Sequence, residues 1–183
     1  MKTNNSILAC MMGIAIFIMS CGPQKTSETD HSGHDMSMKK EGMTEMQASM
    51  LLKDKAKEII SAYLALKEAL VQTDAATASL SAKAILVSLE GSEDELADKI
   101  KTDAEHISGT GDVEHQRKHF GSLSDNVYTL IKTTEANDAP LYRQYCPMAF
   151  DNAGGYWISS EKEVLNPYFG DKMLKCGSVK EEL

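Results

Sequence analysis

Through the middle of the chain, apolar residues recur every three or four positions, which is the spacing of one face of an α-helix. The pattern predicts a first helix over about residues 53–72, with its apolar positions at Ala56, Ile59, Ile60, Tyr63, Leu66 and Leu70. A second helix is expected from Asp74, a good N-cap residue, to Gly91, which suits the position after a helix end. The positions expected to be buried in it are Leu80, Ala84 and Val87.

Two further helices follow. In "SEDE", Ser92 stands three residues before Glu95, a capping box that predicts the start of a third helix. Its apolar stripe is Leu96, Ile100, Ala104 and Ile107. "GTGD" interrupts the chain, and Asp112 is expected to cap a fourth helix that runs to about residue 135. The apolar positions of that helix are Val113, Phe120, Leu123, Val127, Leu130 and Ile131. Four amphipathic helices with short connections predict an all-α fold, an antiparallel four-helix bundle.

Beyond Pro140 the helical spacing ends. The segment that follows is dense in Tyr, Trp, Phe, Pro and Gly. We expect an irregular C-terminal cap, rich in aromatic residues, Cys and Met, with a short hairpin through "DNAGGYW".

The N-terminal region has a different character. Lys2 precedes the apolar run "ILACMMGIAIFIMS", which has the length of a signal-peptide core and is too short to span a bilayer. It ends at "IMSCG", which resembles a bacterial lipobox with Cys21 as the lipidated residue. An ordinary signal peptide cut before Cys21 is the alternative, which Ile18 fits poorly. We therefore expect a signal peptide over 1–20 and a lipoprotein of the cell envelope, facing the periplasm or the cell surface. It would be held at the membrane by its lipid alone.

Residues 21–50 are polar and have almost no aliphatic side chains, so a disordered tether is expected there, ahead of a helical domain with its cap over 51–183. The tether nevertheless holds His31, His34, Met36 and Met38, and further Met residues follow at 43, 46 and 50. Thioether and imidazole are ligands that Cu(I) accepts, so metal binding is one explanation. Chance enrichment in a polar linker is the other.

The net charge of the chain argues against a nucleic-acid-binding protein. The formal net charge is −8, whereas nucleic-acid binding favours a basic surface. A base-oriented nucleophile and a paired-carboxylate motif are not evident, so an enzyme is not expected.

The cap holds a second group of sulfur residues. "YCPMAF" places Cys146 and Met148 two positions apart, on one side of an extended segment, and "KMLKCG" places Met173 and Cys176 three apart, on one side of a helical turn. Four sulfurs that converge would select Cu(I) or Ag(I), because thioether is not a usual zinc ligand. The alternative is a Cys146–Cys176 disulfide, with both Met residues packed in the core.

Four polar residues of the helices also need an explanation. His115 and His119 lie four apart on one helical face and can chelate a metal, although we expect that face to be simply exposed. His106, beside the third apolar stripe, is expected to be packed or hydrogen-bonded. Arg117 lies on the inward side of the fourth helix, so it should find a carboxylate or backbone carbonyls.

"QRKHFGSLSDNVYTLIK", "YCPMAF", "GGYWIS" and "NPYFGDKMLKCG" together resemble the DUF3347 domain over about residues 55–179. The resemblance implies an envelope protein of Bacteroidetes-type bacteria, of a family found alone or attached to periplasmic adaptors of heavy-metal efflux pumps. It thereby implies copper or silver handling by association. "CPM" is also similar to the Cys-Pro-Met-His core of short heavy-metal-binding domains, but Ala149 stands here in place of the His.

The expected function is therefore binding of Cu(I) or Ag(I) for buffering, resistance or transfer, with an efflux-pump adaptor or another copper protein as partner. The alternative is a metal-free interaction module, stapled by a Cys146–Cys176 disulfide, that docks on an envelope partner.

Overall fold

The computed structural model describes residues 37–183. Its helices are α1 (Ser37–Val71), α2 (Ala75–Ser88), α3 (Glu95–Ser108) and α4 (Val113–Thr134). After them come β1 (Tyr142–Cys146), the short α5 (Ala149–Asn152), β2 (Gly155–Ser159), the 3-10 turn η1 (Gly170–Lys172) and β3 (Ser178–Glu182). This part of the chain is thus mostly helical, with a small antiparallel sheet at its C-terminal end.

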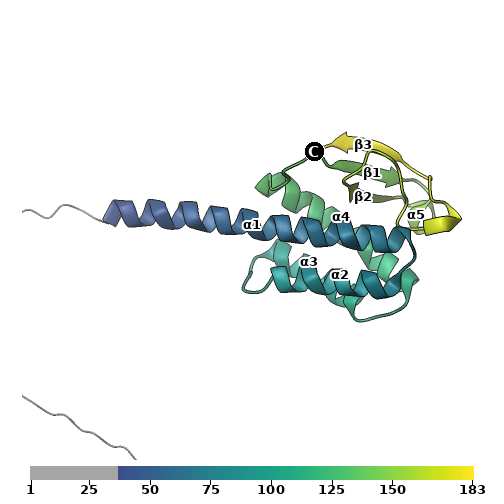
Figure 1. Ribbon diagram of the computed structural model, residues 1–183, viewed down its shortest axis with the longest axis horizontal. Coiled ribbons are helices and arrows are strands. Elements are labelled where there is room, and N and C mark those ends of the chain that lie inside the picture. The colour runs from purple at the N-terminus through teal and green to yellow at the C-terminus, as the bar shows by residue number, and fades with distance from the viewer. Residues whose placement is uncertain (1–36) are drawn as a thin grey trace, which may run out of the picture. The chain divides into compact units, whose positions relative to one another are not determined.

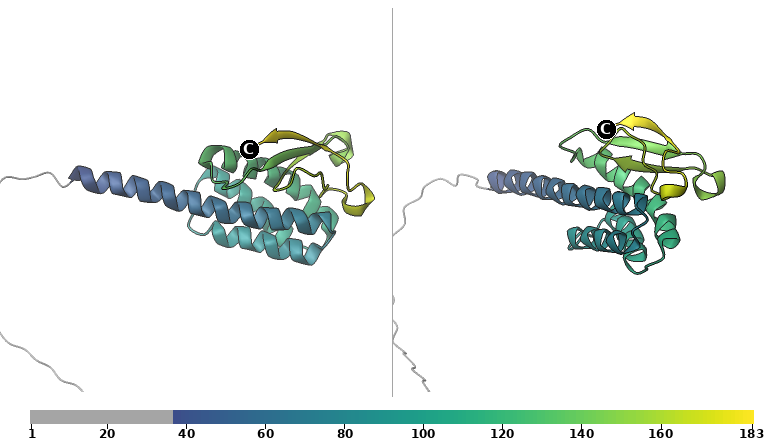
Figure 2. Two further views of the ribbon diagram at one scale, coloured as in Figure 1. Left: turned by 45° about the horizontal axis from the view of Figure 1, so that its top comes forward. Right: turned by 45° about the vertical axis from the view of Figure 1, so that its right-hand side comes forward.

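The helices and the sheet lie in layers (Figure 1). α1 packs against α2 and α4, α3 packs against α2 and α4, and β2 lies against α1 and α4. α1 and α4 therefore separate the sheet from α2 and α3, and the two turned views agree (Figure 2). None of the helices between residues 37 and 183 combines the length and apolar character that a membrane crossing needs.

Side-chain caps account for the helix starts. As predicted, Asp74 and Asp112 are the N-caps of α2 and α4, and their carboxylates accept backbone N–H bonds from the first turn. The third start differs from the prediction: Asp94 caps α3 by accepting the N–H of Ala97 at 2.9 Å, in place of Ser92. Two cap-forming residues, Ser92 and Asp94, stand two positions apart, and the capping-box pattern selected the wrong one.

α1 begins at Ser37, much earlier than the predicted start near residue 53. The last part of the expected tether, from Ser37 to Met50, is accordingly helical. The predicted signal peptide and the tether over 21–36 lie outside the described residues.

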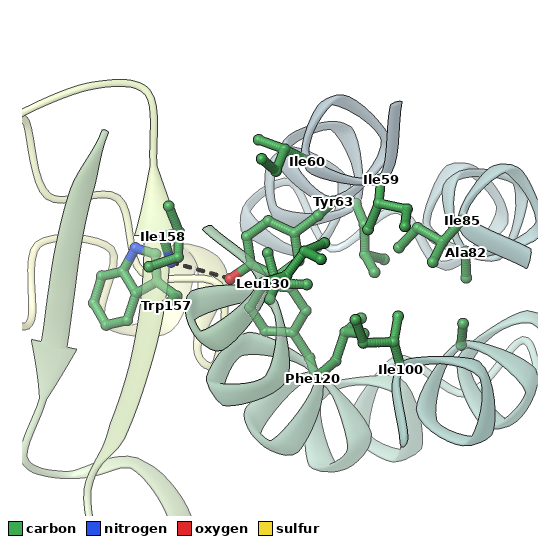
Figure 3. Close-up of a cluster of buried hydrophobic side chains, with 14 of the residues drawn as sticks. Ile59, Ile60, Tyr63, Ala82, Ile85, Ile100, Phe120, Leu130, Trp157 and Ile158 are labelled. Atoms are coloured by element: carbon green, nitrogen blue, oxygen red, sulfur yellow. Dashed lines mark hydrogen bonds between the residues drawn. The ribbon is translucent and has the colours of Figure 1, made fainter. Parts of the chain in front are cut away.

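The core lies between the helices and continues to the sheet (Figure 3). The predicted apolar stripes of α1, α3 and α4 are confirmed, with Leu96 and Val113 only partly buried. The prediction of the buried positions of α2 is wrong, because Leu80 and Val87 are 64% and 65% exposed. α2 instead buries Ala78, Ala82 and Ile85, because small side chains let it approach its neighbours closely.

The cap is more regular than expected. Its strands form an antiparallel sheet in the order β2-β1-β3, in which Arg143 pairs with Ile158 of β2 and Tyr145 with Ser178 of β3. A hairpin does connect β1 to β2 through the predicted turn residues. The irregular cap of the sequence prediction is corrected to this sheet, whose strand pairings join residues too far apart in sequence for local patterns to reveal.

One hydroxyl joins the helices to the sheet. Tyr63 of α1 is fully buried, and its Oη accepts the backbone N–H of Ile158 at 3.0 Å (Figure 3). The same Oη lies 2.7 Å from Oγ of Ser124 on α4. Because β2 is an edge strand, this bond satisfies a backbone donor that its neighbour β1 does not reach.

Candidate metal centres

Cys146 and Cys176 lie side by side. Cys146 is the last residue of β1 and is fully buried, whereas Cys176 precedes β3 and is partly exposed. Both are free thiols, and their Sγ atoms lie 2.9 Å apart. The sheet creates this pair, because the antiparallel register of β1 with β3 brings the end of one strand to the start of the other.

Two residues hold Cys176 in place. Asn166 is fully buried, and its side chain donates to the Cys176 carbonyl at 2.8 Å. Gly177 has a φ of +144°, and a Cβ there would come within 2.8 Å of the Tyr145 carbonyl and 2.9 Å of the Trp157 ring. Only glycine allows the chain to turn this closely against β1.

The environment of Cys176 favours its protonated thiol. The hydrogen bond with Cys146 raises the pKa of Cys176 above its ordinary value, and burial and the charge of a Cys146 thiolate add to it. Loss of the Cys176 proton is therefore shifted to higher pH, and a bound cation would favour it.

Met148 and Met173 are placed differently from the cysteines. They line a common hollow beside α4, together with Arg117, Lys118 and Phe150. Met148 is 46% exposed. Neither cysteine lines this hollow, so the four predicted sulfur residues occur as a dithiol pair and a thioether pair. Their convergence on a single ion stays a prediction.

A segment of strained backbone lies between the Cys-Pro-Met sequence at residues 146–148 and β2. Phe150, Asp151 and Asn152 have φ values of 52°, 55° and 72°, so three successive non-glycine residues are left-handed. Such conformations cost about 1 kcal/mol or more each and persist only where the surroundings hold them. The Phe150 ring packs on Tyr168 and across Gly121 of α4, which holds this turn in place.

Arg117 docks the cap onto the helices, as predicted for an inward-facing arginine. Its guanidinium donates to the carbonyls of Leu70 at 3.0 Å and Pro167 at 2.9 Å, and forms an ion pair with Glu114. Leu70 belongs to α1, and Pro167 directly follows Asn166. One side chain therefore ties α1 and α4 to the loop that positions Cys176.

A cluster of histidines lies at the α3–α4 turn. The ligand nitrogens of His106, His115 and His119 all lie within 4.8 Å of one another. The prediction for His106 is wrong, because its side chain is exposed and stacks on His119 instead of packing into the core. Sequence reasoning paired His115 with His119 and missed the third member. The available signal was that His106 and His115 stand about equally far from the GTGD turn, on two helices that pack together.

The remaining predicted site residues are near the N-terminus. Cys21, His31, His34 and Met36 lie outside the described residues. Met38 lies in α1, where only the course of the backbone is described. The predicted lipidation and tail ligands thus stay predictions.

Comparison with known families gives one match. A family model described as "Protein of unknown function (DUF3347)" matches residues 59–139, from within α1 to the connection before β1. It confirms the predicted resemblance over the helices, and the association with heavy-metal efflux stays a prediction. No curated protein and no solved structure matches the chain.

Proposed function

Over residues 59–139 this chain belongs to the DUF3347 family, whose description states no activity, and we propose its function from its own side chains. It is a lipid-anchored protein of the cell envelope that binds Cu(I) or Ag(I) and buffers the ion or passes it to an efflux-pump adaptor or another copper protein. We include in this proposal that its four helices run as an antiparallel bundle and that Cys21 carries the lipid.

The observation that carries the proposal is the adjacent pair of free thiols, Cys146 and Cys176. Their Sγ atoms are 2.9 Å apart. With metal–sulfur bonds of about 2.3 Å, two ligands of a tetrahedral ion lie about 3.5–4 Å apart. An ion would therefore spread the sulfurs by about 1 Å. Rotation of the Cys176 side chain can supply this movement while its backbone stays held, because that side chain is only partly buried, whereas Cys146 is buried on the central strand.

The thioether pair supports a transfer role. Met148 follows Cys146 by two residues, Met173 precedes Cys176 by three, and the two methionines line one open hollow. Thioethers bind Cu(I) and Ag(I) but not the harder ions of the envelope. An ion held there first would reach the thiols by exchange of one sulfur ligand for another.

The alternative is the metal-free interaction module. The short Sγ–Sγ separation also favours oxidation to a disulfide. A bridge closing 30 residues would stabilise the fold by roughly 3–4 kcal/mol on a loop-entropy argument. In that case the bundle would serve as a stapled scaffold that docks on an envelope partner.

Titration with Cu(I) under reducing conditions, in competition with a chromophoric Cu(I) chelator, separates the two. The mature chain should bind one tightly held ion that Cys176→Ser loses, because a serine hydroxyl does not replace a thiolate. Met148→Leu with Met173→Leu should slow ion uptake while leaving the tight site. The matched control is Ser178→Ala, an exposed neighbour of the pair.

If Cys176→Ser holds Cu(I) as tightly as its parent, the sulfur site is wrong. The interaction module then becomes the better account, and it requires that the protein isolated from the envelope carry the Cys146–Cys176 disulfide.

A further inference from the structure

We propose that His106, His115 and His119 form a second metal site, which binds a divalent transition-metal ion of the Cu(II) or Zn(II) class. It is independent of the sulfur pair. His106 comes from the last turn of α3, and His115 and His119 come from the first half of α4.

The distances suit one ion. An ion bound by nitrogen at about 2.0–2.1 Å holds its ligand atoms about 3.3 Å apart. The three histidines have ligand nitrogens within 4.8 Å of one another, so they need to close by about 1.5 Å at most. His106 and His115 are exposed, so rotation of their side chains can supply that movement without disturbing the core.

One ring must change its tilt. The imidazoles of His106 and His119 are stacked, with centroids 4.1 Å apart and planes within 4°. An ion has to lie near the plane of each ring that binds it, so His106 must splay away from His119 on binding. His115 already stands at 44° to His119, so the two ring planes intersect and one ion can lie near both.

A buried carboxylate orients the third ligand. Oδ1 of Asp103 lies 3.3 Å from Nδ1 of His119, and Asp103 is only 8% exposed. Metal-bound histidines commonly give their second N–H to a carboxylate, which fixes the ring and the tautomer. With Nδ1 donating to Asp103, Nε2 of His119 is left with its lone pair for the ion.

The surroundings leave room for a further ligand. An open hollow beside the cluster is lined by His106 and His115, by the carboxylates of Glu105 and Asp112, and by Thr110. Three imidazoles with an open position suit Zn(II) or Cu(II), and water or an exposed carboxylate can complete the coordination. Packing does not require these rings, because the core under them is made by Ala104, Ile107 and Phe120, all fully buried.

The test uses the full mature chain in which His31→Gln and His34→Gln remove the other two histidines of the sequence. Cu(II) and Zn(II) are titrated separately, and affinity, stoichiometry and the shift in melting temperature are measured. We expect one ion, a rise in melting temperature, and nitrogen hyperfine splitting in the Cu(II) EPR spectrum. His106→Gln should weaken binding at least 100-fold. Lys101→Gln, an exposed change on the same helix, should leave it unaltered.

Asp103→Asn is the second variant. It should weaken binding about 10–100-fold with the stoichiometry kept, because the ring of His119 loses its orienting partner. Melting without metal reports whether each variant folds. The proposal is overturned if His106→Gln binds the ion as tightly as its parent. It is also overturned if the parent binds no ion through nitrogen. Cys176→Ser should still bind an ion at the histidines. A failure of the histidine site can therefore be distinguished from a failure of the sulfur site.

Discussion

Replacing Arg117 with Met should lower the free energy of unfolding by about 2–4 kcal/mol. The side chain is 3% exposed and makes two buried, charge-assisted bonds, to the carbonyls of Leu70 and Pro167. Each such bond contributes about 1.5–3 kcal/mol. The apolar body of Met returns about 1–2 kcal/mol through burial. The Leu70 carbonyl keeps a second donor, the N–H of Thr73 at 3.2 Å, so the loss falls mainly on the Pro167 loop.

Urea unfolding with reductant and chelator present measures the change. Glu114→Gln is the matched control: its ion pair with Arg117 is exposed on the Glu side, so it should cost less than about 1 kcal/mol. Arg117→Met should also make Cys176 react faster with alkylating agents, because the Pro167 loop no longer holds Asn166. A loss below about 1 kcal/mol, or an equal loss in Glu114→Gln, would refute the docking role of the guanidinium.

Four further measurements test other parts of the protein. Because the Cys146 contact raises the pKa of Cys176, its alkylation should need a higher pH than that of a free cysteine, and Cys146→Ala should lower that pH. As pH rises, the Cys176 thiol of the unfolded chain ionises before that of the folded chain. The free energy of unfolding of the reduced protein should therefore fall above the ordinary thiol pKa. A free energy of unfolding that does not change there would count against the Cys146–Cys176 contact. Tyr63→Phe should lower the free energy of unfolding in urea by about 1–3 kcal/mol, because the buried N–H of Ile158 loses its acceptor. Tyr142 is half-buried, and an equal loss in Tyr142→Phe would contradict this role of the Tyr63 hydroxyl. Mass spectrometry of envelope-extracted protein should find Cys21 at the N-terminus with a diacylglyceryl addition, and a soluble, unmodified form would remove the anchor.

The helices could be predicted from the sequence because their signals are local. Caps at Asp74 and Asp112, and apolar spacing along α1, α3 and α4, each involve residues within two turns of one another. α2 shows the limit of this reasoning. Its large apolar residues Leu80 and Val87 outweigh Ala78 and Ala82 in any hydropathy pattern, yet close helix packing selects the small ones.

The sites depended on longer-range geometry. The sequence identified Cys146 and Cys176 as partners through composition and compartment, while their adjacency comes from the pairing of β1 with β3. His106 was expected to be packed or hydrogen-bonded because helical spacing puts it beside the apolar stripe of the third helix, at the border between its buried and exposed faces. Its place beside His115 and His119 follows from the packing of α3 against α4, which the spacing within one helix does not contain.

The Tyr63 and Arg117 bonds have a consequence for where the domain ends. The family match stops at residue 139, yet Tyr63 accepts from Ile158 and Arg117 donates to Pro167, both beyond it. Cutting the chain at that boundary would leave a polar tyrosine tip and a guanidinium on an apolar face that Trp157, Ile158 and Tyr168 now cover. The cooperative unit is therefore longer than the segment that the family model matches, and a chain that ends at that boundary but keeps Tyr63 and Arg117 must supply another cover for that face.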